Sequence, residues 1–449
     1  MQEYADYTSV PTAWLTELPS HWDCKKIGSL FSERKTKVSD KDFQPLSVAK
    51  IGVVPQLETA VKTDAGDNRK LVRAGDFVIN SRSDRKGSCG VSELDGSVSL
   101  INIVLTPRSQ WNSKYVHYLM RSQPFSEEYY RYGRGIVSDL WTTRFSEMKN
   151  ILLPIPSRSE QDQIVRFLDW KVSMINRLIN TKRKEIKAVD AMKRSMVSSA
   201  VTRGLNPGAP MKFSGVKWLG DIPEHWETIK LRQLLHPVSI KNHPELPLLS
   251  VVREQGVIVR DVTDKEANHN YIPDDLSGYK MVKKGQFAMN KMKAWQGSYG
   301  ISDYTGIVSP AYFIFDVSFD NLEYFHYAIR SKVYVNFFAQ ASDGIRVGQW
   351  DLQMDKMKEI PFIVPPADEQ VAIVEYIKET LPRYDVAINK LSAEVETLEE
   401  YKAKLIADVV TGKIDVRDIE IPDYEFIDED ADSDSDSDED AEETEEQED

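Results

Sequence analysis

Cysteine is the scarcest residue in this sequence. Among 449 residues only Cys24 and Cys89 occur, and they are too far apart for a CxxC motif. Two separated thiols cannot build a disulfide framework or a four-cysteine zinc site, so both classes of protein are excluded. We therefore expect a protein of a reducing compartment.

Long apolar runs are also missing. No stretch approaches the roughly 20 apolar residues of a membrane-spanning helix, and no apolar run follows a basic start as in a secretory signal peptide. We therefore expect a cytoplasmic location and no membrane partner.

The sequence lacks the usual motifs of catalysis. It has no GxxxxGK[ST] loop for nucleotide phosphates and no HExxH motif for zinc. Its seven histidines do not cluster with cysteines, and His236 and His243 lie in a proline-containing loop. Asp274 and Asp275 precede Lys280, but no second acid-x-Lys strand of a nuclease site follows. We predict a chain that is not an enzyme and binds no metal or cofactor itself.

The acidic balance is concentrated at one end of the chain. The formal net charge is −14, but residues 423–449 contain 17 acidic residues and no basic one. The rest of the chain, with 57 basic and 54 acidic residues, is slightly basic. Such an acidic run repels itself, so we predict a disordered tail over 416–449. It is interpreted as solubilising, or alternatively as a DNA mimic.

The most informative feature present is an internal repeat. Pro19 to Trp22 recur as Pro223 to Trp226, and GDFVIN at 75–80 recurs as GQFAMN at 285–290. Further residues match in order at an offset of about 209, namely Tyr115 with Tyr324, His117 with His326, Arg121 with Arg330, Trp141 with Trp350 and Glu160 with Glu369. The chain is therefore a tandem duplication of a unit of roughly 200 residues. Because His21 and His225 lie where each unit begins, we interpret them as packing or capping residues rather than catalytic bases.

Each repeat has the same internal order. Short β-branched runs between glycines, such as DFVIN and QFAMN, predict strands, and KYVHYLMRS and EYFHYAIRS predict helices. We predict an α/β or α+β fold with two globular domains over 1–157 and 206–366. Long helices are expected over 158–205 and 367–415.

The two long segments carry a heptad pattern. A period of 3.5 residues held over about five heptads indicates a coiled-coil seam about 60 Å long. We expect the helices to pair antiparallel with pseudo-twofold symmetry; the alternative is that each packs on its own globular domain. The predicted seam residues are Leu168, Val172, Ile175, Ile179, Ile186, Val189, Ile377, Leu381, Tyr384, Ile388, Leu391, Val395 and Leu398.

Two stretches in each repeat are candidate nucleic-acid contacts. The residues after GDFVIN and GQFAMN diverge while their flanks match, as expected for one scaffold with two targets. Basic side chains there suit phosphates or guanine edges, and tryptophan can stack. The alternatives are a solvated hairpin tip and, for Trp141 and Trp350, a place in the core. The candidate DNA-binding residues are Arg82, Arg85, Lys86, Arg131, Tyr132, Arg134, Lys291, Lys293, Trp295, Gln296, Arg346 and Gln349.

The assembled features resemble a known family. The WLG-x-IP-x-HW segment at 218–226, the Gly-Asp-Phe-x-x-Asn block at 75–80 and the exit P-x-x-x-EQ leading to a helix that ends AVTRGL (200–205) are similar to specificity subunits of type I restriction-modification enzymes. The resemblance spans residues 10 to about 415; the acidic tail departs from the family pattern.

The resemblance implies a non-catalytic subunit in which each globular domain reads one half of a bipartite, asymmetric target in double-stranded DNA. The helix pair would fix the gap between the halves. The implied partners are two methylation subunits, which use S-adenosylmethionine on adenine, and restriction subunits that use ATP and Mg. The implied setting is a bacterial or archaeal cytoplasm. A coiled-coil scaffold without a DNA role, and a stand-alone methyltransferase or nuclease, remain alternatives.

Overall fold

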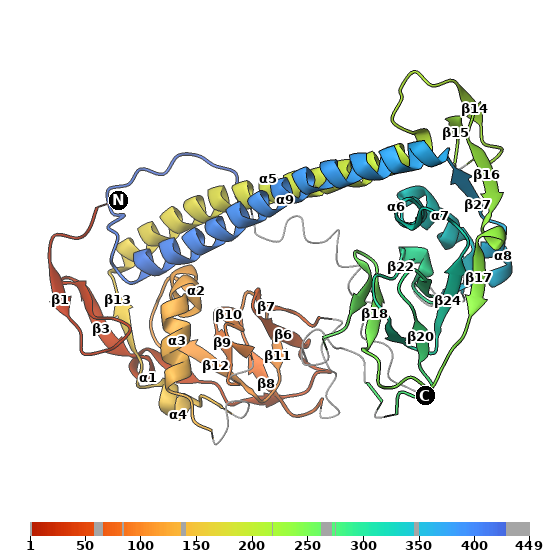
Figure 1. Cartoon of the computed structure of the whole chain (residues 1–449). Helices are drawn as coiled ribbons and strands as arrows, with labels where there is room; N and C mark the ends of the chain where they lie inside the picture. The colour runs from red at the N-terminus through yellow and green to blue at the C-terminus, as the bar shows by residue number, and fades with distance from the viewer. Residues whose placement is uncertain are drawn as a thin grey trace. The chain divides into compact units, whose positions relative to one another are not determined.

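A computed structural model of the chain describes residues 2–57, 66–82, 85–135, 141–217, 219–261, 272–273, 275–344 and 350–427 (Figure 1). The chain divides into two compact units. Unit 1 comprises Met1–Lys182 and Ala393–Ser435, and unit 2 comprises Arg183–Ser392 and Asp436–Asp449. Each long helix is thus shared between the two units.

Unit 1 is built around a four-stranded sheet of order β10-β9-β12-β4. All its strand pairs are antiparallel, and Val78 and Ile79 of β9 are buried between their neighbours. Smaller sheets are β11-β8-β5, β6-β7, β13-β3 and β1-β2. The strands are β1 (Tyr7–Ser9), β2 (Glu17–Pro19), β3 (Asp23–Lys26), β4 (Phe31–Glu33), β5 (Lys37–Val38), β6 (Leu46–Ala49), β7 (Gly52–Pro55), β8 (Arg69–Val72), β9 (Phe77–Asn80), β10 (Cys89–Val91), β11 (Gly96–Val98), β12 (Asn102–Pro107) and β13 (Leu152–Ile155). The helices before the long one are α1 (Ile27–Leu30), α2 (Ser113–Arg121), α3 (Gln123–Arg131) and α4 (Phe145–Met148).

Unit 2 repeats this arrangement. Its four-stranded sheet has the order β17-β24-β21-β22, which matches β4-β12-β9-β10 strand for strand. Its strands are β14 (Met211–Phe213), β15 (Asp221–Pro223), β16 (Glu227–Lys230), β17 (Leu235–Val238), β18 (Leu249–Val252), β19 (Gly256–Val259), β20 (Lys280–Val282), β21 (Phe287–Asn290), β22 (Tyr299–Ile301), β23 (Gly306–Val308), β24 (Tyr312–Val317), β25 (Ser342–Asp343), β26 (Asp351–Leu352) and β27 (Pro361–Val364). Its helices are η3 (Leu231–Gln233), η4 (Ala294–Gln296), α6 (Leu322–Ile329), α7 (Lys332–Gln340) and α8 (Met354–Lys358). The mixed helix-and-strand fold predicted from the sequence is confirmed.

The two long helices are α5 (Arg158–Arg203) and α9 (Ala367–Val410), of 46 and 44 residues. Within unit 1, Lys402 donates from Nζ to Asn176 Oδ1 at 3.2 Å, and Lys182 pairs with Glu394 at 3.1 Å. Within unit 2, Lys193 pairs with Asp385 at 2.6 Å. Residue numbers rise along α5 as they fall along α9, so the helices run antiparallel.

The predicted seam lies on the buried side of both helices. All thirteen of its side chains are buried or half-buried. Leu168 and Ile175 share the core of unit 1 with Leu405 of α9, and Ile377 shares the core of unit 2 with Val201 of α5. Both alternatives for these helices are therefore true, because each helix packs on its partner and on a globular core.

Part of the predicted tail is ordered, and the expectation of disorder is wrong for it. Residues 416–427, named here the strap, lie along α5 in unit 1: Val416 is fully buried, and Ile419 and Ile421 pack on the core. Gln163 donates from Nε2 to the carbonyls of Val416 and Ile419 at 3.0 and 2.9 Å. Composition hid this strap because acidic residues alternate with its apolar ones and lead into the acidic run.

In the part of the chain that the structure describes, no helix is both long and apolar enough to cross a membrane.

Candidate nucleic-acid interface

The two divergent loops leave the central sheets at an asparagine that both repeats share. At the end of β9, Asn80 Oδ1 accepts a hydrogen bond from the backbone N–H of Arg82 at 3.0 Å. At the end of β21, Asn290 Oδ1 accepts from the N–H of Met292 at 3.1 Å. The backbone N–H of each asparagine closes the loop by donating to Ser88 O or Ser298 O, at 2.9 and 3.0 Å. The two loops therefore differ in sequence but are held at both ends by the same hydrogen bonds.

The structure brings together the two stretches that were predicted separately. In unit 1, Thr143 donates its N–H to Ser81 O at 3.0 Å, and Thr142 forms isolated bridges with both Arg82 and Arg134. In unit 2, the corresponding contact joins Leu352 N–H to Lys291 O at 3.1 Å. In unit 1, the loop after β9 and the segment before α4 form one surface. In unit 2, the loop after β21 and the segment before α8 do the same.

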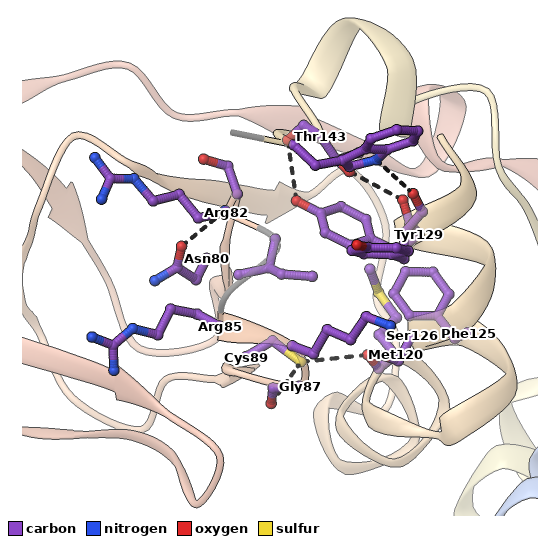
Figure 2. A pocket seen from close by; sticks show the side chains of 15 residues that line it. Asn80, Arg82, Arg85, Gly87, Cys89, Met120, Phe125, Ser126, Tyr129 and Thr143 are labelled. Carbon is purple, nitrogen blue, oxygen red and sulfur yellow. Dashed lines mark hydrogen bonds between the residues drawn. The ribbon is translucent and has the colours of Figure 1, made fainter. Parts of the chain in front are cut away.

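A pocket lies under this surface in unit 1 (Figure 2). Its apolar wall includes Phe125, Tyr129 and Met120, while Arg82 and Arg85 point away from that wall. The Lys86 ammonium lies 3.9 Å from the centroid of the Tyr130 ring, which stacks on Trp141 with centroids 5.9 Å apart. A cation over an aromatic face is attracted by the ring quadrupole.

Trp141 is half-buried, and its Nε1 donates to Tyr130 O at 3.0 Å. This tryptophan therefore supports the loop and presents only part of its ring to solvent. In unit 2, Trp350 packs instead on Trp295 of the loop, with centroids 5.2 Å apart. Trp295 Nε1 donates to Met292 O at 3.1 Å.

The remaining predicted residues occupy different settings. Arg82, Arg85, Lys86, Arg134 and Lys293 are exposed, and Gln296 is half-exposed. Arg131 is exposed and pairs with the buried carboxylate of Glu128 at 3.2 Å, and Tyr132 is half-buried and packs against the core of unit 1. Arg346 and Gln349 lie outside the described residues.

The histidines and arginines shared by the repeats hold hairpins in place, a role that sequence reasoning missed. Arg330 donates from Nη2 to Arg253 O and Glu254 O at 2.7 and 2.8 Å, which fastens the β18–β19 turn to α6. Arg121 makes the equivalent bond to Lys50 O. The spacing of four residues between His117 and Arg121, repeated at His326 and Arg330, was the available signal.

These histidines are kept neutral by their surroundings. Burial and the neighbouring Arg121 lower the pKa of His117 to about 3, and burial and Arg330 lower that of His326 to about 4. Desolvation and a like charge both disfavour the imidazolium form.

The Pro-x-His-Trp motif has a structural role, as predicted. His21 Nε2 lies 3.0 Å from Glu160 Oε2, and Trp226 Nε1 donates to Glu369 Oε2 at 3.0 Å. Both glutamates are in the first turn of a long helix. Trp22 also lies against Gly412. The motif therefore joins the start of one long helix to the end of the other.

Among the described residues, no group of three or more His, Cys, Asp or Glu side chains is arranged to hold a metal ion.

Comparison with known proteins gives the family likeness. The chain is 26% identical over 291 residues to the specificity subunit of the type I restriction enzyme MjaVIII of Methanocaldococcus jannaschii, covering 60% of this chain and 64% of the relative. The putative type I restriction enzyme MjaX specificity subunit of the same organism is 25% identical over 284 residues, covering 61% of each chain. The chain is similar to these type I restriction specificity subunits. Both matches span less than two thirds of the relative.

One solved structure has a similar fold. A chain from a structure concerned with complex assembly and conformational transition of the type I R-M system aligns with a TM-score of 0.57 and 12% identity, covering 88% of this chain and 99% of that one. The HsdS subunit from Thermoanaerobacter tengcongensis aligns over 91% of this chain and 100% of its own, with a TM-score of 0.40 and 14% identity. No protein-family model matches the chain.

Proposed function

We propose that this chain is the DNA-specificity subunit of a type I restriction-modification system. Residues 1–157 and 206–366 act as target recognition domains, and each reads one half of a bipartite, asymmetric sequence. The proposal is supported by one observation: both units have the same scaffold, but the loops that this scaffold holds differ in sequence. In both units an asparagine and a serine hold the loop, while the residues between them differ.

The loops supply the two kinds of contact that sequence-specific binding requires. Lysine and arginine neutralise phosphates, which gives affinity and fixes orientation. Arginine can also bond two atoms of guanine in the major groove. The exposed side chains of Arg82, Arg85 and Arg134 occupy one surface with Trp141 beneath it, which suits these contacts.

The chain itself does no chemistry in this proposal. Two methylation subunits bind S-adenosylmethionine and modify adenine, and restriction subunits use ATP and Mg to translocate and cut. Helices 158–205 and 367–415 serve as the spacer that sets the unspecified gap between the half-sites. Their length fits the role, since 46 residues of helix extend about 69 Å, or about two turns of B-DNA.

Reconstitution tests the proposal. The full chain is incubated with DNA and S-adenosylmethionine, first alone and then with the methylation subunits of its own system. We expect adenine methylation only when the methylation subunits are present. We also expect the DNA affinity of the complex to fall steeply with salt. Methyl transfer by the chain alone, or DNA affinity independent of salt, would overturn the proposal.

A further inference from the structure

The two recognition loops occupy equivalent positions but present different side chains. With Asn80 aligned on Asn290, the loop positions of Arg82, Arg85 and Lys86 hold Met292, Trp295 and Gln296 in unit 2. Each loop has seven residues between its asparagine and its closing serine. The loops therefore have the same length and the same asparagine and serine at their ends, and they differ in the side chains between them.

Unit 1 concentrates positive charge at this surface. The described residues of its two stretches, 81–82, 85–87, 131–135 and 141–143, include five basic and no acidic residues, whereas 291–297, 340–344 and 350–352 include two basic and two acidic. Arg82 and Arg134 lie together because both bridge to Thr142, and both are exposed. The Lys86 ammonium lies over the Tyr130 ring, whereas the side chains of Arg82 and Arg85 point away from the pocket wall (Figure 2).

In unit 2, an ion pair neutralises part of the positive charge of the loop, and an apolar side chain is exposed. Lys291 pairs with Asp351 at 3.0 Å, and the counterpart of Asp351 in unit 1 is the uncharged Thr142. Met292 is 39% exposed. Trp295 donates a hydrogen bond from Nε1 to the Met292 carbonyl, and the Trp350 ring packs against the Trp295 ring. Lys293 is the remaining basic side chain of this loop.

We infer that the two units read their half-sites by different chemistry. Unit 1 uses guanidinium contacts, whose matched base is guanine through O6 and N7. Unit 2 uses the Met292–Trp295 edge, whose matched group is the 5-methyl of thymine. The inference rests on the proposed function, because it assigns a kind of contact to each proposed recognition loop.

Reciprocal substitutions at one pair of equivalent positions provide the test. Full-length R82M and M292R chains, each in complex with the methylation subunits, are titrated with target DNA over a range of salt. The logarithm of affinity falls with the logarithm of salt with a slope of about −0.9 for each phosphate neutralised. Because a guanine contact neutralises no phosphate, we expect R82M to leave the slope nearly unchanged and to reduce the preference for guanine in the unit 1 half-site by roughly tenfold. M292R adds a cation and should make the slope steeper by up to about 0.9. M292A should lower affinity by about the same factor at every salt concentration.

A second measurement addresses the bases. The half-site of each unit is assigned by which half loses preference when that unit's loop is substituted. Replacing thymine with uracil in the unit 2 half-site removes only methyl groups. We expect the wild-type chain to bind the uracil-containing DNA more weakly than the thymine-containing DNA, and the M292A chain to bind both equally. An unchanged preference for guanine in R82M, or full tolerance of uracil, would overturn the inference. Loss of all sequence preference in the wild-type complex would instead overturn the proposed function.

Discussion

His117 and His326 connect the repeat to a measurable property of the folded chain. Each lies between a glycine-containing strand and an arginine that holds a hairpin turn, and the backbone N–H of Val91 or Ile301 donates to its Nδ1. Their lowered pKa values mean that the folded chain binds fewer protons than the unfolded chain in mildly acidic solution. Stability linked to these groups is therefore complete above the ordinary histidine pKa of 6.5 and falls as the pH drops toward 4.

The substitution H326Q should reduce this acid sensitivity in unit 2. Glutamine can still accept the Ile301 hydrogen bond but does not titrate, so the loss of stability between pH 6.5 and 4 should be shallower than in the wild type. Urea unfolding at several pH values, with the exposed His236→Gln as control, measures the slope. A variant slope as steep as that of the wild type would show that His326 is not the responsible group.

Asn80 fixes the recognition loop of unit 1 through its carboxamide oxygen. Removing this acceptor in N80A should destabilise the folded conformation of the loop by roughly 1 kcal/mol. We expect specific affinity to drop by about five- to tenfold, with non-specific affinity retained. N80D keeps an acceptor oxygen and should restore most of the preference. Binding to target and non-target DNA measures the ratio, and an unchanged ratio in N80A would exclude a positioning role.

At the scale of elements, the strap fixes the C-terminal end of α9 to α5. Ser173 Oγ both donates to Glu425 O at 3.0 Å and accepts from Ile427 N–H at 2.8 Å, and Arg177 pairs with Glu425 at 3.3 Å. The two bonds to Ser173 use strap backbone, so they depend little on strap side chains. Burial of Val416 adds apolar area to the unit 1 core.

Two truncations separate the strap from the acidic run beyond it. Ending the chain before Val416 should lower the melting temperature of unit 1, because it exposes core and leaves Gln163 without its carbonyl partners. Ending it after Ile427 keeps every contact described for the strap and should leave the melting temperature unchanged. Equal melting temperatures for both truncations would show that the strap is not a structural element. DNA affinity at low salt, compared between the longer truncation and the full chain, tests the DNA-mimic alternative for the acidic run.

The elements were largely predictable because their signals are local. Heptad spacing predicted the helix pair, and glycine-bounded β-branched runs such as FVIN predicted strands such as β9. Sheet order was not predictable, since β9 pairs with β12 across more than twenty residues of chain. The meeting of the 81–86 loop with Thr142 and Thr143 depends on that order, and no local pattern marks it.

At the scale of the whole molecule, α5 and α9 each run through both units, so their common length bears on the proposed gap between half-sites. The ion pairs Lys182–Glu394 and Lys193–Asp385 fix their antiparallel register. A heptad removed from both helices in register keeps the seam in phase.

Deleting 183–189 together with 388–394 should shorten the recognised gap. Seven helical residues extend about 10.5 Å, which corresponds to about three base pairs at 3.4 Å each. The half-site sequences should not change. Deleting 183–189 alone puts the helices out of register and should lower stability instead. A double deletion that methylates the original spacing would contradict the role of the helices as spacer.

Mapping of methylated adenines in a host that carries this chain with its methylation subunits tests the central claim most directly. The account predicts one bipartite, asymmetric motif with a fixed unspecified gap, in which the R82M chain changes one half and the M292R chain changes the other. A single continuous motif, or methylation without any sequence preference, would contradict it.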